Sequence, residues 1–141
     1  MIIRTIKNSL QTAAAKNWEK TYWAFDIHGT ILHPTYQTGV VSSEFYPDAV
    51  EVLQIISRRE DIVRILYTCS FPHEILTYLE YFKKHGIRFD HVNENPAICT
   101  GAYGHYERKF YFNILFEDKA GFDPMKDWTA VLGFLRKLGW T

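Results

Sequence analysis

The feature that most constrains the fold is a set of short apolar segments that do not alternate with polar residues. The first covers residues 22 to 25 and stops at Asp26, which is soon followed by His28, Gly29 and Thr30. A strand without alternation is buried on both faces, as in a parallel sheet. We therefore expect Asp26 at the end of a buried strand, where the chain turns and exposes backbone N–H groups to an anion.

The rest of the chain alternates between strand and helix patterns, with turn residues between them. This order predicts an α/β fold in which a mostly parallel central sheet lies between helical layers, as one domain over residues 1–141. Residues 1–20 are expected to form a helical N-terminal extension, either packed on the domain or free to bind a partner. The predicted strands are 22–25, 62–67, 88–93 and 113–116, and the predicted helices are 3–16, 47–59, 72–85 and 127–138.

Composition excludes several classes of protein. The chain has 141 residues, is 47% hydrophobic, and carries 16 basic against 16 acidic side chains. A neutral, apolar chain of this size favours one folded domain and gives no electrostatic case for binding nucleic acid or a membrane surface. No segment has the length of a membrane span or the pattern of a signal peptide, so a cytoplasmic location is expected. The two cysteines, Cys69 and Cys99, lack metal-ligand spacing.

Polar side chains follow three of the predicted strands. Asp26 ends the first strand, Thr68 follows the second, and Glu117 and Asp118 follow the last. Ligands of parallel α/β sheets bind beyond the carboxyl ends of the strands, so these groups are expected at one edge. Carboxylates beside a hydroxyl predict a cation site with an anion next to it.

The segment Asp26-Ile27-His28-Gly29-Thr30 resembles the first motif of the haloacid dehalogenase (HAD)-like hydrolases, whose usual form is Asp-x-Asp-Gly-Thr. His28 stands where that family has its second aspartate. The resemblance extends from about residue 22 to residue 138 and implies a Rossmann-like fold. The segments between the predicted elements leave no room for a separate cap domain.

The resemblance implies a role for each strand-end residue. Asp26 would be the nucleophile, Thr68 would bind the phosphoryl group, and Lys109 would offset its charge. Mg²⁺ would be held by Asp26, by the backbone carbonyl of His28, and by Glu117 and Asp118, with Asp123 as a further candidate acid.

The implied activity is magnesium-dependent hydrolysis of a phosphomonoester through an aspartyl-phosphate on Asp26. His28 would take the place of the aspartate that protonates the leaving oxygen, since imidazole is a competent general acid. The alternative is a catalytically impaired domain that binds a phosphorylated ligand or a protein partner. The substrate, whether a small molecule or a macromolecule, is not identified, and a homo-oligomer stays open.

Several of these residues also have an ordinary structural interpretation. Thr68 can also be interpreted as an ordinary strand-end hydroxyl, and Ser70 as the cap of the following helix. Lys109 belongs to a charge run that includes Arg108, its rival for the same role. Asp123 precedes a proline, so it could cap a turn instead of binding metal.

Overall fold

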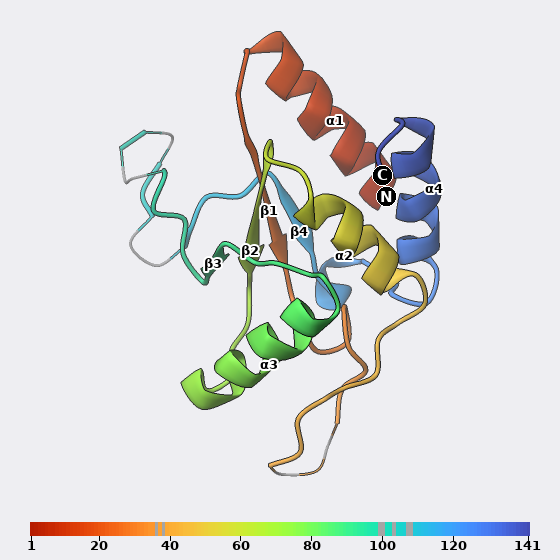
Figure 1. The fold of residues 1–141 in the computed structure, drawn as a ribbon. Helices are drawn as coiled ribbons and strands as arrows, with labels where there is room; N and C mark the ends of the chain where they lie inside the picture. Colours follow the sequence, from red (N-terminus) through yellow and green to blue (C-terminus); the bar gives the residue numbers. More distant parts are fainter. Residues whose placement is uncertain (36, 38, 99–100, 103, 107–108) are drawn as a thin grey trace.

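The structure is a computed structural model, and it describes residues 1–35, 37, 39–98, 101–102, 104–106 and 109–141. Four helices, one short 3₁₀ helix and four strands follow one another within these residues (Figure 1). The helices are α1 (Ile2–Ala15), α2 (Ala49–Ser57), α3 (Pro72–Lys84) and α4 (Asp127–Lys137), with η1 at Asp118–Ala120. The strands are β1 (Thr21–Phe25), β2 (Ile62–Leu66), β3 (His91–Val92) and β4 (Ile114–Phe116).

The four strands form one parallel sheet in the order β3-β2-β1-β4. In the centre of the sheet, Phe25 of β1 pairs with Leu66 of β2 and Phe116 of β4. Because all strands run in one direction, their carboxyl ends meet at a single edge. The predicted α/β class with a parallel central sheet is therefore confirmed.

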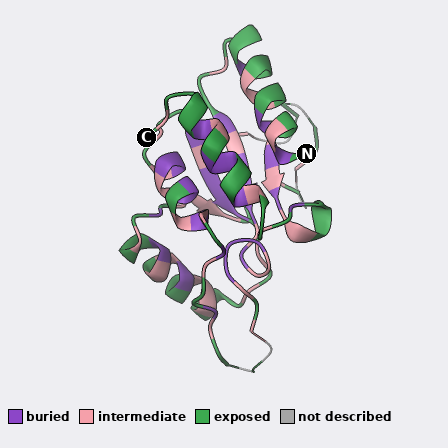
Figure 2. Ribbon diagram, turned by 90° about the vertical axis from the view of Figure 1, so that its right-hand side faces the viewer, coloured by how far each residue is buried: buried purple, intermediate pink, exposed green. Residues whose placement is uncertain are grey.

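The sheet is covered on both faces, which is consistent with a three-layer Rossmann-like arrangement. Helices α1, α2 and α4 pack together over one face, where α4 contacts both of the others (Figures 1 and 2). On the opposite face, Tyr111 from the chain just before β4 packs edge-on against Tyr22 of β1, with ring centroids 6.0 Å apart. Among the described residues, the first of these layers is therefore helical, and the second includes the loop residues around Tyr111.

Stacked aromatic rings fill the space between the sheet and α4. Phe25 stacks on Phe116 with centroids 4.5 Å apart, and Phe116 is parallel to Trp128 of α4 at 5.5 Å. All three side chains are fully buried. Trp128 also donates its indole N–H to the backbone carbonyl of Thr30 at 2.7 Å. This stack fixes the ends of β1 and β4 directly beneath the loop that follows β1.

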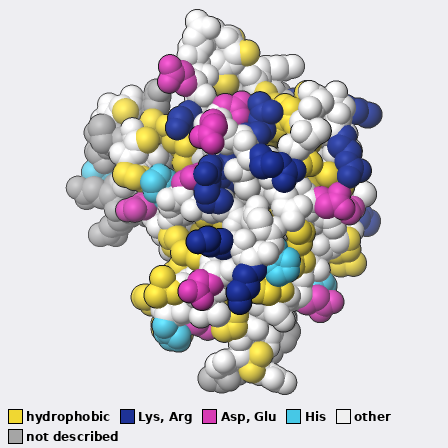
Figure 3. Space-filling model, in the orientation of Figure 1, with side chains coloured by type: hydrophobic (Ala, Val, Ile, Leu, Met, Phe, Trp, Pro, Cys, Tyr) yellow, Lys and Arg dark blue, Asp and Glu magenta, His cyan; other side chains and the backbone are white. Residues whose placement is uncertain are grey.

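The N-terminal helix is part of this packing. Within α1, Ile2, Ile6 and Ala13 are buried, and the helix contacts β1, β4 and α4. Its apolar residues recur at helical spacing, so one face packs on the domain while the other is exposed. No helix among the described residues combines the length and apolar character needed to cross a membrane. Basic and acidic side chains are interspersed on the face drawn in Figure 3.

One predicted helix cap and one predicted strand differ from the structure. Helix α3 begins at Pro72 with Phe71 as its N-cap, and Glu74 accepts a hydrogen bond from the Phe71 N–H. Ser70 is therefore not the cap of this helix. The predicted strand 88–93 is reduced to β3, which ends before Asn93, where φ is +54°.

A buried arginine joins α2, β2 and the start of β3. Arg64 is 2% exposed, and its guanidinium pairs with Asp90 at 3.0 Å. The same guanidinium donates to the carbonyl oxygens of Ile56 and Arg59 at the end of α2. Asp90 in turn accepts from the Arg64 backbone N–H at 2.8 Å. The carboxylate of Asp90 therefore offsets the buried charge, and the guanidinium satisfies carbonyl groups at the end of the helix, while its Nε has no hydrogen-bond partner among the described residues.

We predict that Asp90→Ala lowers the free energy of unfolding by about 2–3 kcal/mol, because it leaves the buried Arg64 charge without its partner. The control is Asp61→Ala, which removes an exposed ion pair with Arg59 and should cost about 0–1 kcal/mol. Urea denaturation measures both values. Equal losses in the two variants would contradict the structural role of the Arg64–Asp90 pair.

Candidate metal centre

Three carboxylates meet at the carboxyl ends of β1 and β4. Asp26, Glu117 and Asp118 each offer an oxygen within 4.8 Å of the others. The arrangement follows from the sheet, because the Asp26 N–H donates to the Phe116 carbonyl at 2.9 Å and so continues the β1–β4 pairing. Strand pairing alone therefore brings together acids separated by some ninety residues in the sequence.

A cleft of about 430 Å³ opens over these carboxylates. Its walls come from the loops after β1, β2 and β4, as expected for a parallel sheet. The lining combines three acids with a histidine, a lysine, a threonine, a cysteine and a tyrosine. They are Asp26, His28, Tyr67, Thr68, Cys69, Glu117, Asp118 and Lys119.

The loop after β1 is shaped by Gly29 and Thr30. Gly29 has a φ of +77°, and a Cβ there would lie 2.7 Å from Oδ2 of Asp118. Only glycine allows both the turn and the close approach of that carboxylate. The buried Thr30 hydroxyl accepts from the Asp118 N–H at 3.1 Å and donates to Asp26 over a long 3.4 Å. One side chain thus positions two of the three acids.

Burial and mutual repulsion leave the carboxylates poorly compensated. Desolvation, with smaller contributions from Glu117 and Asp118, raises the pKa of Asp26 to about 6. Desolvation and the adjacent Asp118 also raise the pKa of Glu117. A hard cation bound among these oxygens would offset the repulsion, and carboxylate oxygens are the ligands that Mg²⁺ and Ca²⁺ prefer. The donor set therefore fits the predicted divalent ion, while the identity of the ion stays a prediction.

His28 lies at the edge of the cleft and is held by helix α3. Its Nε2 is 2.7 Å from the hydroxyl of Tyr78, which also accepts the backbone N–H of Ser42 at 3.3 Å. Because the Tyr78 oxygen already accepts a proton donor, its own hydrogen is best donated to Nε2, which favours the Nδ1–H tautomer. Desolvation lowers the pKa of His28, while the charge of Glu74 opposes that shift.

Thr68 occupies the predicted position at the end of β2 and lines the cleft. Its hydroxyl is 2.9 Å from the hydroxyl of Ser70 and accepts the Ser70 N–H at 3.2 Å. Asn93 holds the Thr68 backbone from both sides, accepting its N–H at 2.9 Å and donating to its carbonyl at 2.7 Å. The backbone is thus fixed, and the Thr68 hydroxyl lies at the cleft.

The structure places Lys109, the predicted charge-neutralising residue, outside the cleft. Lys119 lines the cleft, whereas Lys109 lines a neighbouring hollow that shares Tyr67 with it. Arg108, the rival of Lys109, lies outside the described residues. The Asp123 carboxylate accepts the Met125 N–H at 3.1 Å, so it caps the turn before α4 and does not line the cleft. Metal binding by the His28 carbonyl stays a prediction.

Three residues at or below the cleft were not assigned from the sequence. Lys119 follows the acid pair directly, and Thr30 belongs to the motif, so both had a local signal. Tyr78 had none, because it lies fifty positions from His28 on a helix whose orientation the sequence does not specify. Its hydroxyl is the group that fixes the imidazole.

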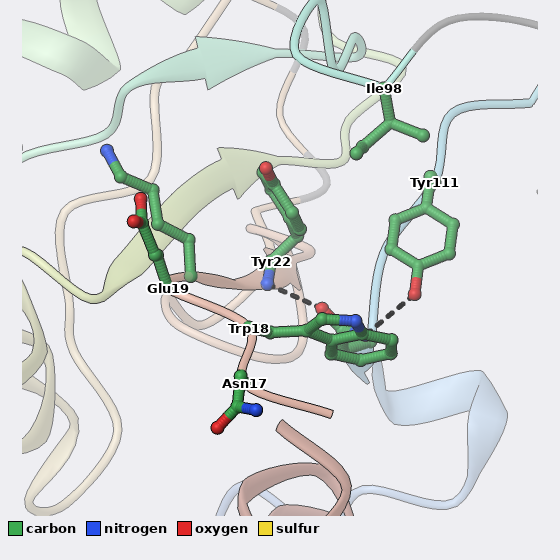
Figure 4. Close-up of a pocket in the computed structure, with 8 residues that line it drawn as sticks. Asn17, Trp18, Glu19, Tyr22, Ile98 and Tyr111 are labelled. Carbon is green, nitrogen blue, oxygen red and sulfur yellow. Dashed lines mark hydrogen bonds between the residues drawn. The ribbon is translucent and has the colours of Figure 1, made fainter. Parts of the chain in front are cut away.

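A separate hollow of about 320 Å³ lies at the opposite end of β1 (Figure 4). There Asn113 accepts the Tyr22 N–H at 2.7 Å and donates to the Tyr111 hydroxyl at 3.0 Å. The two bonds tie β1 to the segment that precedes β4. The hollow holds a single acid, Glu19, and a single base, Lys20, so its charges do not form a metal site.

Comparison with known proteins supports the fold. No protein-family model matches the chain, and no curated protein matches it. A solved structure, described as a conserved protein of Bacteroides thetaiotaomicron, superposes with a TM-score of 0.63 at 22% identity. The superposition covers 84% of this chain and 91% of that one. At this identity the likeness concerns the fold alone.

We predict that Asp26→Asn stabilises the metal-free protein at pH 7 by about 1 kcal/mol, a value reduced for the solvent that reaches the half-buried side chain. The pKa of Asp26 is about 6 in the folded chain, against 3.8 for an aspartate outside a fold. Between these two pH values the folded state binds a proton on Asp26 that the unfolded state does not bind. The wild type therefore gains stability as the pH falls through 6 toward 4. The benefit of Asp26→Asn should shrink over the same interval.

Urea denaturation in EDTA at pH 7 and pH 4.5 measures this difference. Asp123→Asn serves as the matched control, because it alters an acid that caps a turn outside the cleft. A difference in stability between Asp26→Asn and the wild type that is equal at both pH values would contradict the raised pKa of Asp26. Added Mg²⁺ should raise the melting temperature of the wild type and of Asp123→Asn, but not that of Asp26→Asn.

Proposed function

We propose that this chain is a HAD-like, magnesium-dependent phosphatase that hydrolyses a phosphomonoester through an aspartyl-phosphate on Asp26. The observation that carries the proposal is the cluster of Asp26, Glu117 and Asp118 at the rim of the sheet, in a cleft with Thr68 and Lys119. The cleft thus combines a nucleophile, a set of cation ligands, and a hydroxyl and an ammonium group suited to phosphate. Sequence order and spacing agree with the family pattern.

In the first chemical step an Asp26 carboxylate oxygen bonds to phosphorus while the bond from phosphorus to the ester oxygen breaks. The alcohol leaves after taking up a proton, and an acyl phosphate remains on Asp26. Water then attacks the phosphorus, releasing inorganic phosphate and restoring the carboxylate. A pKa of about 6 leaves Asp26 mostly ionised at pH 7 and hence nucleophilic.

The other cleft residues position and neutralise the transferring group. The Thr68 hydroxyl, with its backbone fixed by Asn93, can donate to a phosphoryl oxygen. The Lys119 ammonium is the described lysine that lines the cleft, and it takes the neutralising role first expected of Lys109. Mg²⁺ bound to the three carboxylates would supply further compensation of the phosphoryl charge.

His28 is the residue that protonates the leaving oxygen in this scheme. Its pKa is lowered by burial, so only a minor fraction carries the extra proton at neutral pH. The charged form is the acid, so leaving-group protonation by His28 weakens as the pH rises above its pKa. The same observation favours the second candidate function, a domain that binds a phosphorylated ligand and turns it over slowly or not at all.

We predict that Asp26→Asn abolishes magnesium-dependent hydrolysis and that His28→Asp raises kcat at least tenfold, by restoring the family's acid–base residue. The assay follows release of phosphate from an alkyl phosphomonoester with and without Mg²⁺. Asp123→Asn, outside the cleft, should behave as the wild type.

The variants also separate the two candidate functions. An inactive wild type that His28→Asp revives would favour the binding function. If no variant hydrolyses the substrate or binds Mg²⁺, both candidate functions are refuted. Retained activity in Asp26→Asn would exclude the covalent route.

We predict that Tyr78→Phe lowers kcat for alkyl phosphates several-fold, because it removes the hydroxyl that fixes the His28 ring. The matched control is Tyr81→Phe on the same helix, whose hydroxyl donates to the Ser43 carbonyl but is not bonded to His28. The comparison is repeated in a His28→Ala background, where the effect of Tyr78→Phe should vanish. An undiminished effect there would show that Tyr78 acts on stability alone.

A further inference from the structure

A second hollow shares a wall with the carboxylate cleft. It has a volume of about 570 Å³, and Tyr67 lines both spaces. Pockets of roughly 300–1,000 Å³ accept ligands of small-molecule size. Most of its lining is aromatic, in contrast to the acidic cleft, and includes Tyr67, Tyr106, Lys109, Phe110, Phe112 and Leu115.

The alternation of side chains places the two spaces on the same face of the sheet. Phe25 points toward α4, so its neighbours Ala24 and Asp26 point to the opposite face, as Leu115 and Glu117 do on β4. Leu115 lines the aromatic hollow and Glu117 lines the cleft. Two residues of a strand span about 7 Å, so the hollow begins one side-chain step from the carboxylates.

The pairing of β2 with β1 extends this geometry to the shared wall. The Tyr67 N–H donates to the Phe25 carbonyl at 2.8 Å, which places Tyr67 beside Asp26. On its other side, the Tyr67 ring meets Phe110 with centroids 6.0 Å apart, and Phe110 meets Phe112 at 5.8 Å. A ligand held at Asp26 would therefore pass Tyr67 and reach the aromatic residues.

The rings of this hollow retain accessible surface. Tyr67 is 44% exposed and Phe112 is 37% exposed, although both are large and apolar. Aromatic walls with open faces favour a flat ring, which they contact by stacked or edge-on packing. Lys109 in the same lining adds a cation that a ring or a second anionic group can approach.

We propose that this hollow is the leaving-group subsite of the site described above and that it accepts a planar aromatic ring carried by the phosphomonoester. The inference rests on the proposed function, because the phosphoryl group is taken to lie beside Asp26. It assigns Lys109 to the leaving group instead of the phosphoryl group. Two sources share this chemistry, a tyrosine phosphate and a nucleoside monophosphate.

The first experiment compares benzyl, cyclohexylmethyl and ethyl phosphate, whose leaving groups are all primary alcohols. Matching the leaving groups in this way removes most of the difference in intrinsic reactivity. We expect kcat/KM for benzyl phosphate to exceed that for cyclohexylmethyl phosphate about three- to tenfold, as aromatic packing allows, and that for ethyl phosphate by more. Equal values for all three would overturn the subsite and leave the phosphatase proposal standing.

Substitutions then locate the subsite. Tyr67→Ala and Phe112→Ala should each reduce the ratio of kcat/KM for benzyl over ethyl phosphate at least threefold, mainly through KM. Leu76→Ala is the control, because Leu76 is 67% exposed on α3 and lines neither space. An unchanged ratio in both aromatic variants would place the ring elsewhere and refute the assignment.

Competition distinguishes the two sources. O-Phosphotyrosine and adenosine 5′-monophosphate are tested as inhibitors of benzyl phosphate hydrolysis. Their inhibition is compared with the inhibition caused by ethyl phosphate. Stronger inhibition by either aromatic compound supports the subsite and identifies the source, whereas inhibition by neither beyond that of ethyl phosphate overturns it.

If the chain hydrolyses none of these phosphates, the subsite is tested by ligand binding. In that case benzylphosphonate and ethylphosphonate are titrated into the Mg²⁺-loaded protein. Tighter binding of benzylphosphonate, lost in Phe112→Ala, would support the subsite although the catalytic proposal had failed. Equal affinities would refute the subsite as well.

Discussion

The pairing of β1 with β4 is the interaction on which the rest of the structure depends. It forces Asp26 next to Glu117 and Asp118, and like charges at that separation repel. Burial, and to a smaller extent this repulsion, raises the pKa of Asp26 to about 6. The strand ends cannot move apart to relieve it, because Phe25 and Phe116 are stacked on each other and on Trp128. A rigid aromatic core therefore holds the carboxylates where a cation would stabilise them.

Much of this arrangement is encoded locally and could be predicted. Residues 22–25 and 113–116 lack alternation, which indicates a parallel sheet, and in a parallel sheet the groups that follow the strands meet at one edge. The position of Asp26 beside Asp118 therefore follows from two short segments and one rule of topology. The motif glycine is explained as well, since a Cβ at Gly29 would collide with the Asp118 carboxylate.

Contacts that depend on how a helix or loop is oriented could not be predicted. Tyr78 contacts His28 because of the way α3 is oriented relative to the cleft. The sequence around neither residue indicates that orientation. Lys109 and Lys119 are both lysines close to β4 in the sequence, yet they line different spaces. Ser70 has the character of a helix cap, but Phe71 occupies that position and Ser70 pairs with Thr68 instead.

Helix α3 links the backbone at Ser42 and Ser43 to a residue that lines the cleft, His28. Tyr78 accepts from the Ser42 backbone, and Tyr81, one turn later, donates to the Ser43 carbonyl. The first of these tyrosines also holds the imidazole of His28. A displacement of the segment at Ser42 must therefore change the hydrogen bonding of the Tyr78 hydroxyl, and with it the preferred tautomer of His28. A single phenol oxygen therefore joins the backbone at Ser42 to the imidazole at the edge of the cleft.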